Sequence, residues 1–89
     1  MEFESTSVFD NDVKKLDKNG RKKLKNLLEK IALQPESGKP MEHYANVFSK
    51  RTTNRRLVWQ VNKKKDKIRL LLYKNRDGAY DALRQMKAK

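Results

Sequence analysis

The chain has 89 residues and carries 23 Lys and Arg side chains against 11 acidic ones, which gives a formal net charge of +12. This length allows one domain with a modest core, and the longest aliphatic run, Leu70-Leu71-Leu72, is far too short to span a membrane. The acidic start MEFESTSVFD lacks the features of a signal peptide, and the absence of cysteine excludes disulfides and thiolate chemistry. We therefore expect a cytoplasmic protein whose positive charge favours a polyanionic partner, most often a nucleic acid.

The first half of the chain predicts a short strand followed by two helices. Residues 2–8 are compatible with a strand that Phe3 anchors. Asp10 is a candidate cap for a short helix, and we expect the turn at residues 18–20 to interrupt that helix. A second helix is predicted from about residue 21 to residue 33, where four apolar side chains form one stripe: Leu24, Leu27, Leu28 and Ile31.

The second half predicts three strands, because the apolar period changes from helical to two. The strands are expected at residues 44–52, 55–62 and 67–74, and a short helix containing Leu83 is expected to follow them. In the middle strand Leu57, Trp59 and Val61 fall on one face, opposite Arg56 and its neighbours. The order β-α-α-β-β-β-α predicts an α+β fold over residues 1–89. In it, two N-terminal helices pack on one face of a small antiparallel sheet.

The positive charge is concentrated in two stretches of different character. Residues 14–30 have a net charge of +6 on the predicted second helix and the segment before it, and a solvated helix surface is their simplest explanation. Residues 50–76 have eleven bases and one acid, a net charge of +10, on predicted strands and turns. The second stretch is therefore the better candidate for binding a specific ligand.

We expect several of these basic side chains to converge on the sheet face away from the helices. Arg56 points to that face by strand parity, and either Lys50 or Arg51 must share it. Arg76 and Tyr80 follow the last strand at the same end of the sheet. A phosphodiester fits such a cluster, because Arg offers a fork to two phosphate oxygens and Tyr can stack on a base or move a proton.

Metal-free cleavage of RNA would use such a cluster. A base would remove the proton of the 2′-hydroxyl, cations would stabilise the charge at phosphorus, and an acid would protonate the leaving oxygen. The candidate bases are Glu42, His43, Tyr80 or a lysine with a lowered pKa. We expect no metal and no cofactor, since the basic half offers only Asp66 and Asp77 as carboxylate ligands. Charge alone does not separate a nuclease from a passive RNA or DNA binder.

Three segments resemble the RelE/YoeB-type toxins. FSKRTTNRRLVWQV resembles their strand–turn–strand, which reads approximately S-R-R-I-x-x-x-H-R-L-V-Y. YKNRDGAYDALR resembles their closing pattern of a basic residue, then Arg, three residues and Tyr. The loop QPESGKPME is similar to the proline- and glycine-bearing connection that precedes the strand in this family.

The resemblance implies the microbial RNase-like fold of RelE and a ribosome-dependent messenger-RNA endonuclease. It further implies a type II toxin–antitoxin system, with a cognate antitoxin and mRNA on the ribosome as partners. The residues that match the family's catalytic positions are Arg51, Arg56, Arg76 and Tyr80. Glu42 lies one residue beyond the place of the general base in YoeB-like members, so the base is either Glu42, or Tyr80 with a lysine as in RelE-like members.

Four further residues are predicted to bind RNA. Lys50 stands beside Arg51, Arg55 replaces the family's histidine, Lys74 is the basic residue of the closing pattern, and Gln60 shares the face of Arg56. Two rival functions remain open. ParE-like proteins have a similar fold and inhibit DNA gyrase, and a non-catalytic RNA-binding module would bind without cutting. The combination of Arg56, Arg76 and Tyr80 favours the nuclease. An inactivated toxin of the same family is a further possibility, and the sequence does not distinguish it from an active one.

Overall fold

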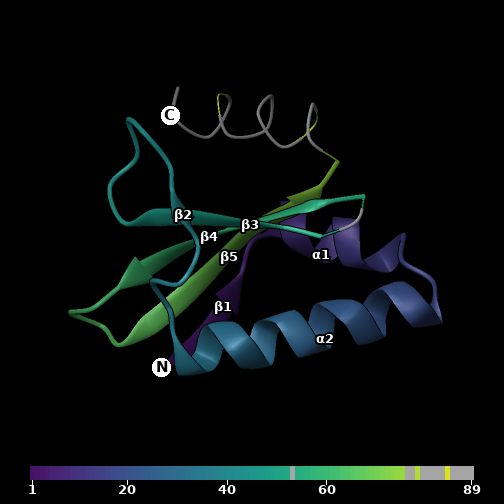
Figure 1. Ribbon diagram of the computed structural model, residues 1–89, viewed down its shortest axis with the longest axis horizontal. Coiled ribbons are helices and arrows are strands. Elements are labelled where there is room, and N and C mark those ends of the chain that lie inside the picture. Colours follow the sequence, from purple (N-terminus) through teal and green to yellow (C-terminus); the bar gives the residue numbers. More distant parts are fainter. Residues whose placement is uncertain (53, 76–77, 79–83, 85–89) are drawn as a thin grey trace.

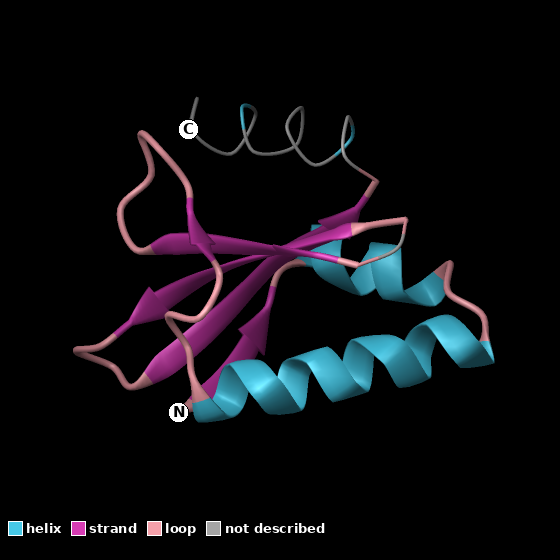
Figure 2. Cartoon of the chain, viewed as in Figure 1, coloured by secondary structure: helices cyan, strands magenta, loops and turns pink. Residues whose placement is uncertain are grey.

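The computed structural model describes residues 1–52, 54–75, 78 and 84 of the chain. Within them, five strands form one sheet in the order β1-β5-β4-β3-β2, and two helices lie on one side of it (Figures 1 and 2). None of the described helices is long and apolar enough to cross a membrane. The predicted α+β class is confirmed, with these bounds: β1 Glu2–Ser5, α1 Ser7–Lys14, α2 Lys18–Leu33, β2 Lys39–Pro40, β3 Val47–Arg51, β4 Arg56–Asn62 and β5 Lys67–Lys74.

The sheet is mixed, whereas the sequence predicted an antiparallel one. The meander β3-β4-β5 is antiparallel as expected, but β1 pairs in parallel with β5, with Phe3 opposite Ile68. In the sequence, both helices come between β1 and the other strands. The chain therefore crosses over from β1 to the rest of the sheet through the helices, and such a connection allows β1 to run parallel to β5. The short strand β2, which was expected to be part of a loop, pairs with β3 at the other edge.

Both helices begin earlier than predicted, because other residues cap them. Thr6 is the N-cap of α1, and its hydroxyl accepts a hydrogen bond from the Phe9 amide at 3.1 Å. Asp10 lies in the first turn instead. Asp17 is the N-cap of α2 and accepts from the Gly20 amide at 2.7 Å, so the turn predicted at residues 18–20 is the first turn of the helix.

Strand β3 is shorter than predicted because the chain before it forms a tight loop. His43 and Asn46 have positive φ angles of 67° and 57°, which a strand does not accommodate. The strand therefore begins at Val47 and not at residue 44. The helix predicted after the last strand lies outside the described residues.

The main core fills the space between the helices and the sheet. Leu57, Trp59 and Val61 face the helices, as strand parity predicted, and Trp59 is fully buried. The Trp59 indole donates a hydrogen bond to the carbonyl of Pro35 at 2.7 Å, which ties the segment after α2 to β4. The helices contribute Phe9, Leu24, Leu27 and Ile31 to this core.

Helix α1 also closes the edge of β5 that the short strand β1 leaves open. The Thr6 amide donates to the Leu70 carbonyl at 3.1 Å, and the Thr6 hydroxyl donates to the Leu71 carbonyl at 2.6 Å. Six residues further on, the Asp12 carboxylate accepts from the Tyr73 amide at 3.1 Å. Asp12 is 1% exposed, so α1 supplies a buried acceptor for the Tyr73 amide, which lies beyond the part of β5 that pairs with β1.

We expect Gly38→Ala to lower the free energy of unfolding by about 1–3 kcal/mol, the usual cost of overpacking. A Cβ atom at Gly38 would overlap the Trp59 ring and come within 2.7 Å of the Ser49 carbonyl oxygen. Urea denaturation followed by tryptophan fluorescence measures the loss. A variant as stable as the wild type would show that β2 can move away from Trp59 at little cost.

Candidate nucleic-acid interface

Three basic residues on neighbouring strands form a row across the sheet. Arg51 of β3 pairs in register with Arg56 of β4, and Arg56 pairs with Lys74 of β5. Residues directly opposite each other share a face, and adjacent strands lie about 4.8 Å apart, so the three Cα atoms span roughly 10 Å. We call Arg51, Arg56 and Lys74 the cationic row. It lies on the face away from the helix-packed core, as predicted for Arg56.

Two members of the row are held in place by hydrogen bonds. The Arg56 guanidinium donates to the hydroxyl of Ser49 at 2.9 Å, and Ser49 is itself buried. The Lys74 ammonium donates to the Asp12 carboxylate at 2.6 Å, so the carboxylate that completes the edge of β5 also positions Lys74. Arg51 is exposed at the end of β3. The row therefore combines two fixed cations with one exposed cation.

Register shows which predicted residues belong to this face. Arg51, and not Lys50, shares the face of Arg56, because Lys50 lies opposite Leu57 of the main core. Arg55 also lies on the helix side, where its guanidinium donates to the Tyr73 carbonyl at 2.8 Å. Lys50 and Arg55, two of the residues predicted to bind RNA, therefore lie on the opposite side of the sheet from Arg56. Successive residues of a strand alternate between faces, and Arg55 lies in the turn that precedes β4.

Gln60 is on the predicted face but at the opposite end of the sheet. It is four residues from Arg56, which is about 13 Å along a strand, and its amide donates to the Ala45 carbonyl at 3.2 Å. Gln60 lines a hollow of about 300 Å³ beside Lys67 and Arg69. In that hollow the Lys67 ammonium lies 2.7 Å from the Glu4 carboxylate, and this hydrogen bond lowers the pKa of Glu4.

The face of the cationic row also has an apolar cluster, which the sequence of the last predicted strand indicates. Val47, Val58, Leu71 and Leu72 are buried there, with Val8, Met41 and Tyr44 packed against them. The signal was the run Leu70-Leu71-Leu72, which is too apolar for a strand with one solvated face. An irregularity in the β4–β5 pairing after Val58 allows Leu71 and Leu72 to join the same cluster.

The candidate general bases are not placed equally well. Glu42 and His43 are exposed in the loop between β2 and β3, whose flanking residues Met41 and Tyr44 pack against the apolar cluster. This loop therefore borders the face of the cationic row. Arg76 and Tyr80 lie outside the described residues. No group of His, Asp or Glu in the described part of the chain could hold a metal ion.

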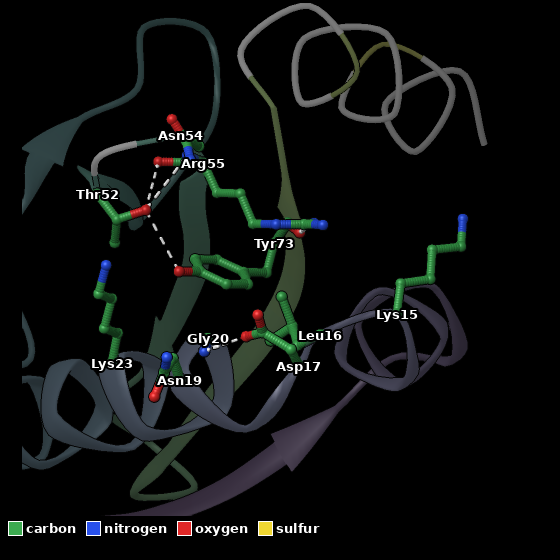
Figure 3. Close-up of a pocket in the computed structure, with 10 residues that line it drawn as sticks. All are labelled: Lys15, Leu16, Asp17, Asn19, Gly20, Lys23, Thr52, Asn54, Arg55 and Tyr73. Carbon is green, nitrogen blue, oxygen red and sulfur yellow. Dashed lines mark hydrogen bonds between the residues drawn. The ribbon is translucent and has the colours of Figure 1, made fainter.

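A second hollow lies on the helix side, at the same end of the sheet as the cationic row (Figure 3). It has a volume of about 460 Å³ and is bounded by the α1–α2 connection and by the turn between β3 and β4. We call it the corner pocket. The Arg55 guanidinium lies over the Tyr73 ring, with its central carbon 5.6 Å from the ring centroid. Lys15 and Lys23 also line the pocket.

Comparison with known structures identifies the class of fold. No protein-family model matches the chain, and no curated protein matches it in sequence. Several solved structures do match, including the E. coli RelBE toxin–antitoxin complex, at 18% identity and a TM-score of 0.75 over 83% of this chain and 94% of that one. The chain therefore has the RelE fold, as the sequence resemblance predicted.

Two further structures give the same result. The isolated E. coli RelE toxin matches at 16% identity and a TM-score of 0.75, over 96% of this chain and 97% of that one. A YoeB/ParE toxin from Agrobacterium tumefaciens matches at 19% identity and a TM-score of 0.74, over 84% of this chain and 98% of that one. At these identities the likeness establishes the fold of the chain.

Proposed function

We propose that this chain is the toxin of a type II toxin–antitoxin system and cleaves messenger RNA on the ribosome. The observation that supports the proposal most strongly is the cationic row, Arg51–Arg56–Lys74, on the sheet of a RelE fold. Three adjacent cations stand against one carboxylate, Asp12, and a bound phosphodiester neutralises the remaining excess of positive charge. The sequence resemblance to RelE/YoeB-type toxins supports the same function.

The row suits the charge that develops during cleavage by the 2′-hydroxyl. When that hydroxyl attacks the adjacent phosphorus, negative charge grows on the non-bridging oxygens, and the Arg56 guanidinium can donate to two of them. Ser49 and Asp12 fix Arg56 and Lys74 before the substrate arrives, so little reorganisation is needed during the reaction. Arg51, which is exposed, can bind an adjacent phosphate of the same strand.

The proton transfers require a base for the 2′-hydroxyl and an acid for the 5′-oxygen that leaves. Glu42 is one candidate base, in a loop bordering the face of the row, and Tyr80 with a lysine is the other. Arg76 is proposed to join the row at the phosphate. The mechanism needs no metal ion, because the cations provide the charge stabilisation that a metal would otherwise supply.

The proposed partner is a cognate antitoxin that covers the cationic face. The E. coli RelBE structure and others of this fold are toxin–antitoxin complexes, which supports such a partner here. An acidic or amphipathic segment laid over the row and its apolar cluster would neutralise the charge and exclude mRNA. Co-expression with the neighbouring reading frame would then relieve toxicity and yield a stable complex.

Primer extension on translating ribosomes tests the nuclease directly. A defined message is incubated with ribosomes and increasing amounts of the protein, and new 5′ ends are mapped. We expect new ends within the ribosome-bound region of the message and none in naked RNA at the same protein concentration. An intact message at high protein concentration would contradict the proposal, and gyrase-dependent DNA breaks would favour the ParE-like alternative.

A further inference from the structure

The corner pocket is a concentration of positive charge separate from the cationic row. Lys15, Lys23 and Arg55 line it, against one acidic side chain, Asp17 (Figure 3). The Asp17 carboxylate already accepts from the Gly20 amide as the cap of α2. Within the described part of the chain, none of the three basic residues forms an ion pair. The pocket therefore has an excess of positive charge that an anion would stabilise.

The floor of the pocket is built from hydrogen-bonded groups. Tyr73 is 3% exposed, and its ring lies beneath the Arg55 guanidinium. The Thr52 hydroxyl donates to the Arg55 carbonyl at 3.0 Å, accepts from the Arg55 amide at 3.2 Å, and lies 3.3 Å from the Tyr73 hydroxyl. Arg55 is thus fixed through both its backbone and its side chain.

Arg55 retains donors for a ligand. A guanidinium has five N–H groups, and the described hydrogen bonds of Arg55 use one of them, to the Tyr73 carbonyl. The side chains of Asn19 and Asn54 line the same pocket and can donate as well. The start of α2 adds the partial positive charge of a helix N-terminus. The pocket therefore presents cations and amide donors to one space.

We propose that the corner pocket binds a phosphate group of an RNA backbone, as a second RNA contact on the opposite side of the sheet from the cationic row. The polar lining favours phosphate over a protein partner, because protein interfaces are usually centred on an apolar anchor. Here the apolar lining is Leu16 and the buried Tyr73. Arg55 and Arg56 are consecutive, so an RNA strand that passes round this end of the sheet can contact both sites.

This inference deepens the proposed function but does not require cleavage, so the two can fail separately. The probe is a six-nucleotide 2′-O-methyl RNA, which has no free 2′-hydroxyl and cannot be cut by that route. Binding is measured by fluorescence anisotropy and by NMR shifts of the Gly20 and Asn54 amides. The test variant is Lys15→Ala/Lys23→Ala. The control is Lys14→Ala/Lys22→Ala, which removes the same charge from exposed neighbours outside the pocket.

We expect the test variant to weaken RNA binding about tenfold at moderate salt and to reduce the salt dependence by about 0.7 per lost phosphate contact. The control should lose less than about threefold. Equal losses in the two variants would overturn the proposal, because charge alone would then explain the binding. Shifts of Gly20 and Asn54 with an oligoglutamate peptide but not with the RNA would also overturn it, and would assign the pocket to an acidic protein segment.

Discussion

Replacing Arg56 by alanine should lower the rate of mRNA cleavage by about 10²–10³-fold, the usual effect of removing one fixed donor to a developing oxyanion. Arg56 is the central member of the cationic row, and Ser49 holds its guanidinium in place. Single-turnover cleavage on programmed ribosomes measures the rate. The change should leave the fold intact, with a loss of about 1 kcal/mol from the unpaired Ser49 hydroxyl.

Arg69→Ala is the matched control for this prediction. Arg69 is an exposed arginine on the same face of the sheet, opposite Gln60 at the far end, so its loss removes the same charge without touching the row. We expect its effect on the rate to be less than about fivefold, since it acts only through long-range attraction of the substrate. Equal rates for the two variants would show that Arg56 has no specific role at the phosphate.

Asp12→Ala should lower the free energy of unfolding by about 2–4 kcal/mol, a large part of the stability of a small domain. The substitution leaves the Tyr73 amide without its acceptor and the Lys74 ammonium without its partner. Because Lys74 retains some contact with solvent, we place the cost below that of breaking a fully buried ion pair. Thermal and urea denaturation measure it.

Two companion variants separate the roles of Asp12. Asp12→Asn keeps an oxygen to accept from the Tyr73 amide but removes the charge, so it should cost about 1–2 kcal/mol and leave Lys74 less well positioned. Asp10→Ala, in the exposed first turn of the same helix, should cost less than about 1 kcal/mol. If Asp10→Ala were as destabilising as Asp12→Ala, the loss of any acidic residue from helix α1 would lower the stability by this amount. The hydrogen bonds between Asp12 and β5 would then not explain the effect.

Most of the fold followed from local patterns in the sequence. The alternation of Leu57, Trp59 and Val61 predicted the core face of β4, and all three pack beneath the helices. The parallel pairing of β1 was not predictable from local patterns. It joins residues that are more than sixty positions apart in the sequence, with Phe3 opposite Ile68.

The candidate site was predicted in part. The face of Arg56 follows from strand parity, but the choice between Lys50 and Arg51 depends on the register across the β3–β4 turn, which sequence spacing leaves ambiguous. Arg55 was singled out because it replaces the family's histidine, and that match carries no information on its side of the sheet, which the turn sets as the helix side. The ion pair of Lys74 with Asp12 joins segments that are far apart in the sequence, so no local sequence pattern predicts it.

The most direct test of the account is cleavage of a ribosome-bound message with one 2′-deoxy nucleotide at the mapped cut site. If the chain cleaves RNA by attack of the 2′-hydroxyl on a phosphate held by the cationic row, the all-ribose message is cut there and the substituted message is not. Equal cutting of both messages would contradict the 2′-hydroxyl mechanism. An all-ribose message that stays intact on translating ribosomes would contradict the proposed nuclease itself.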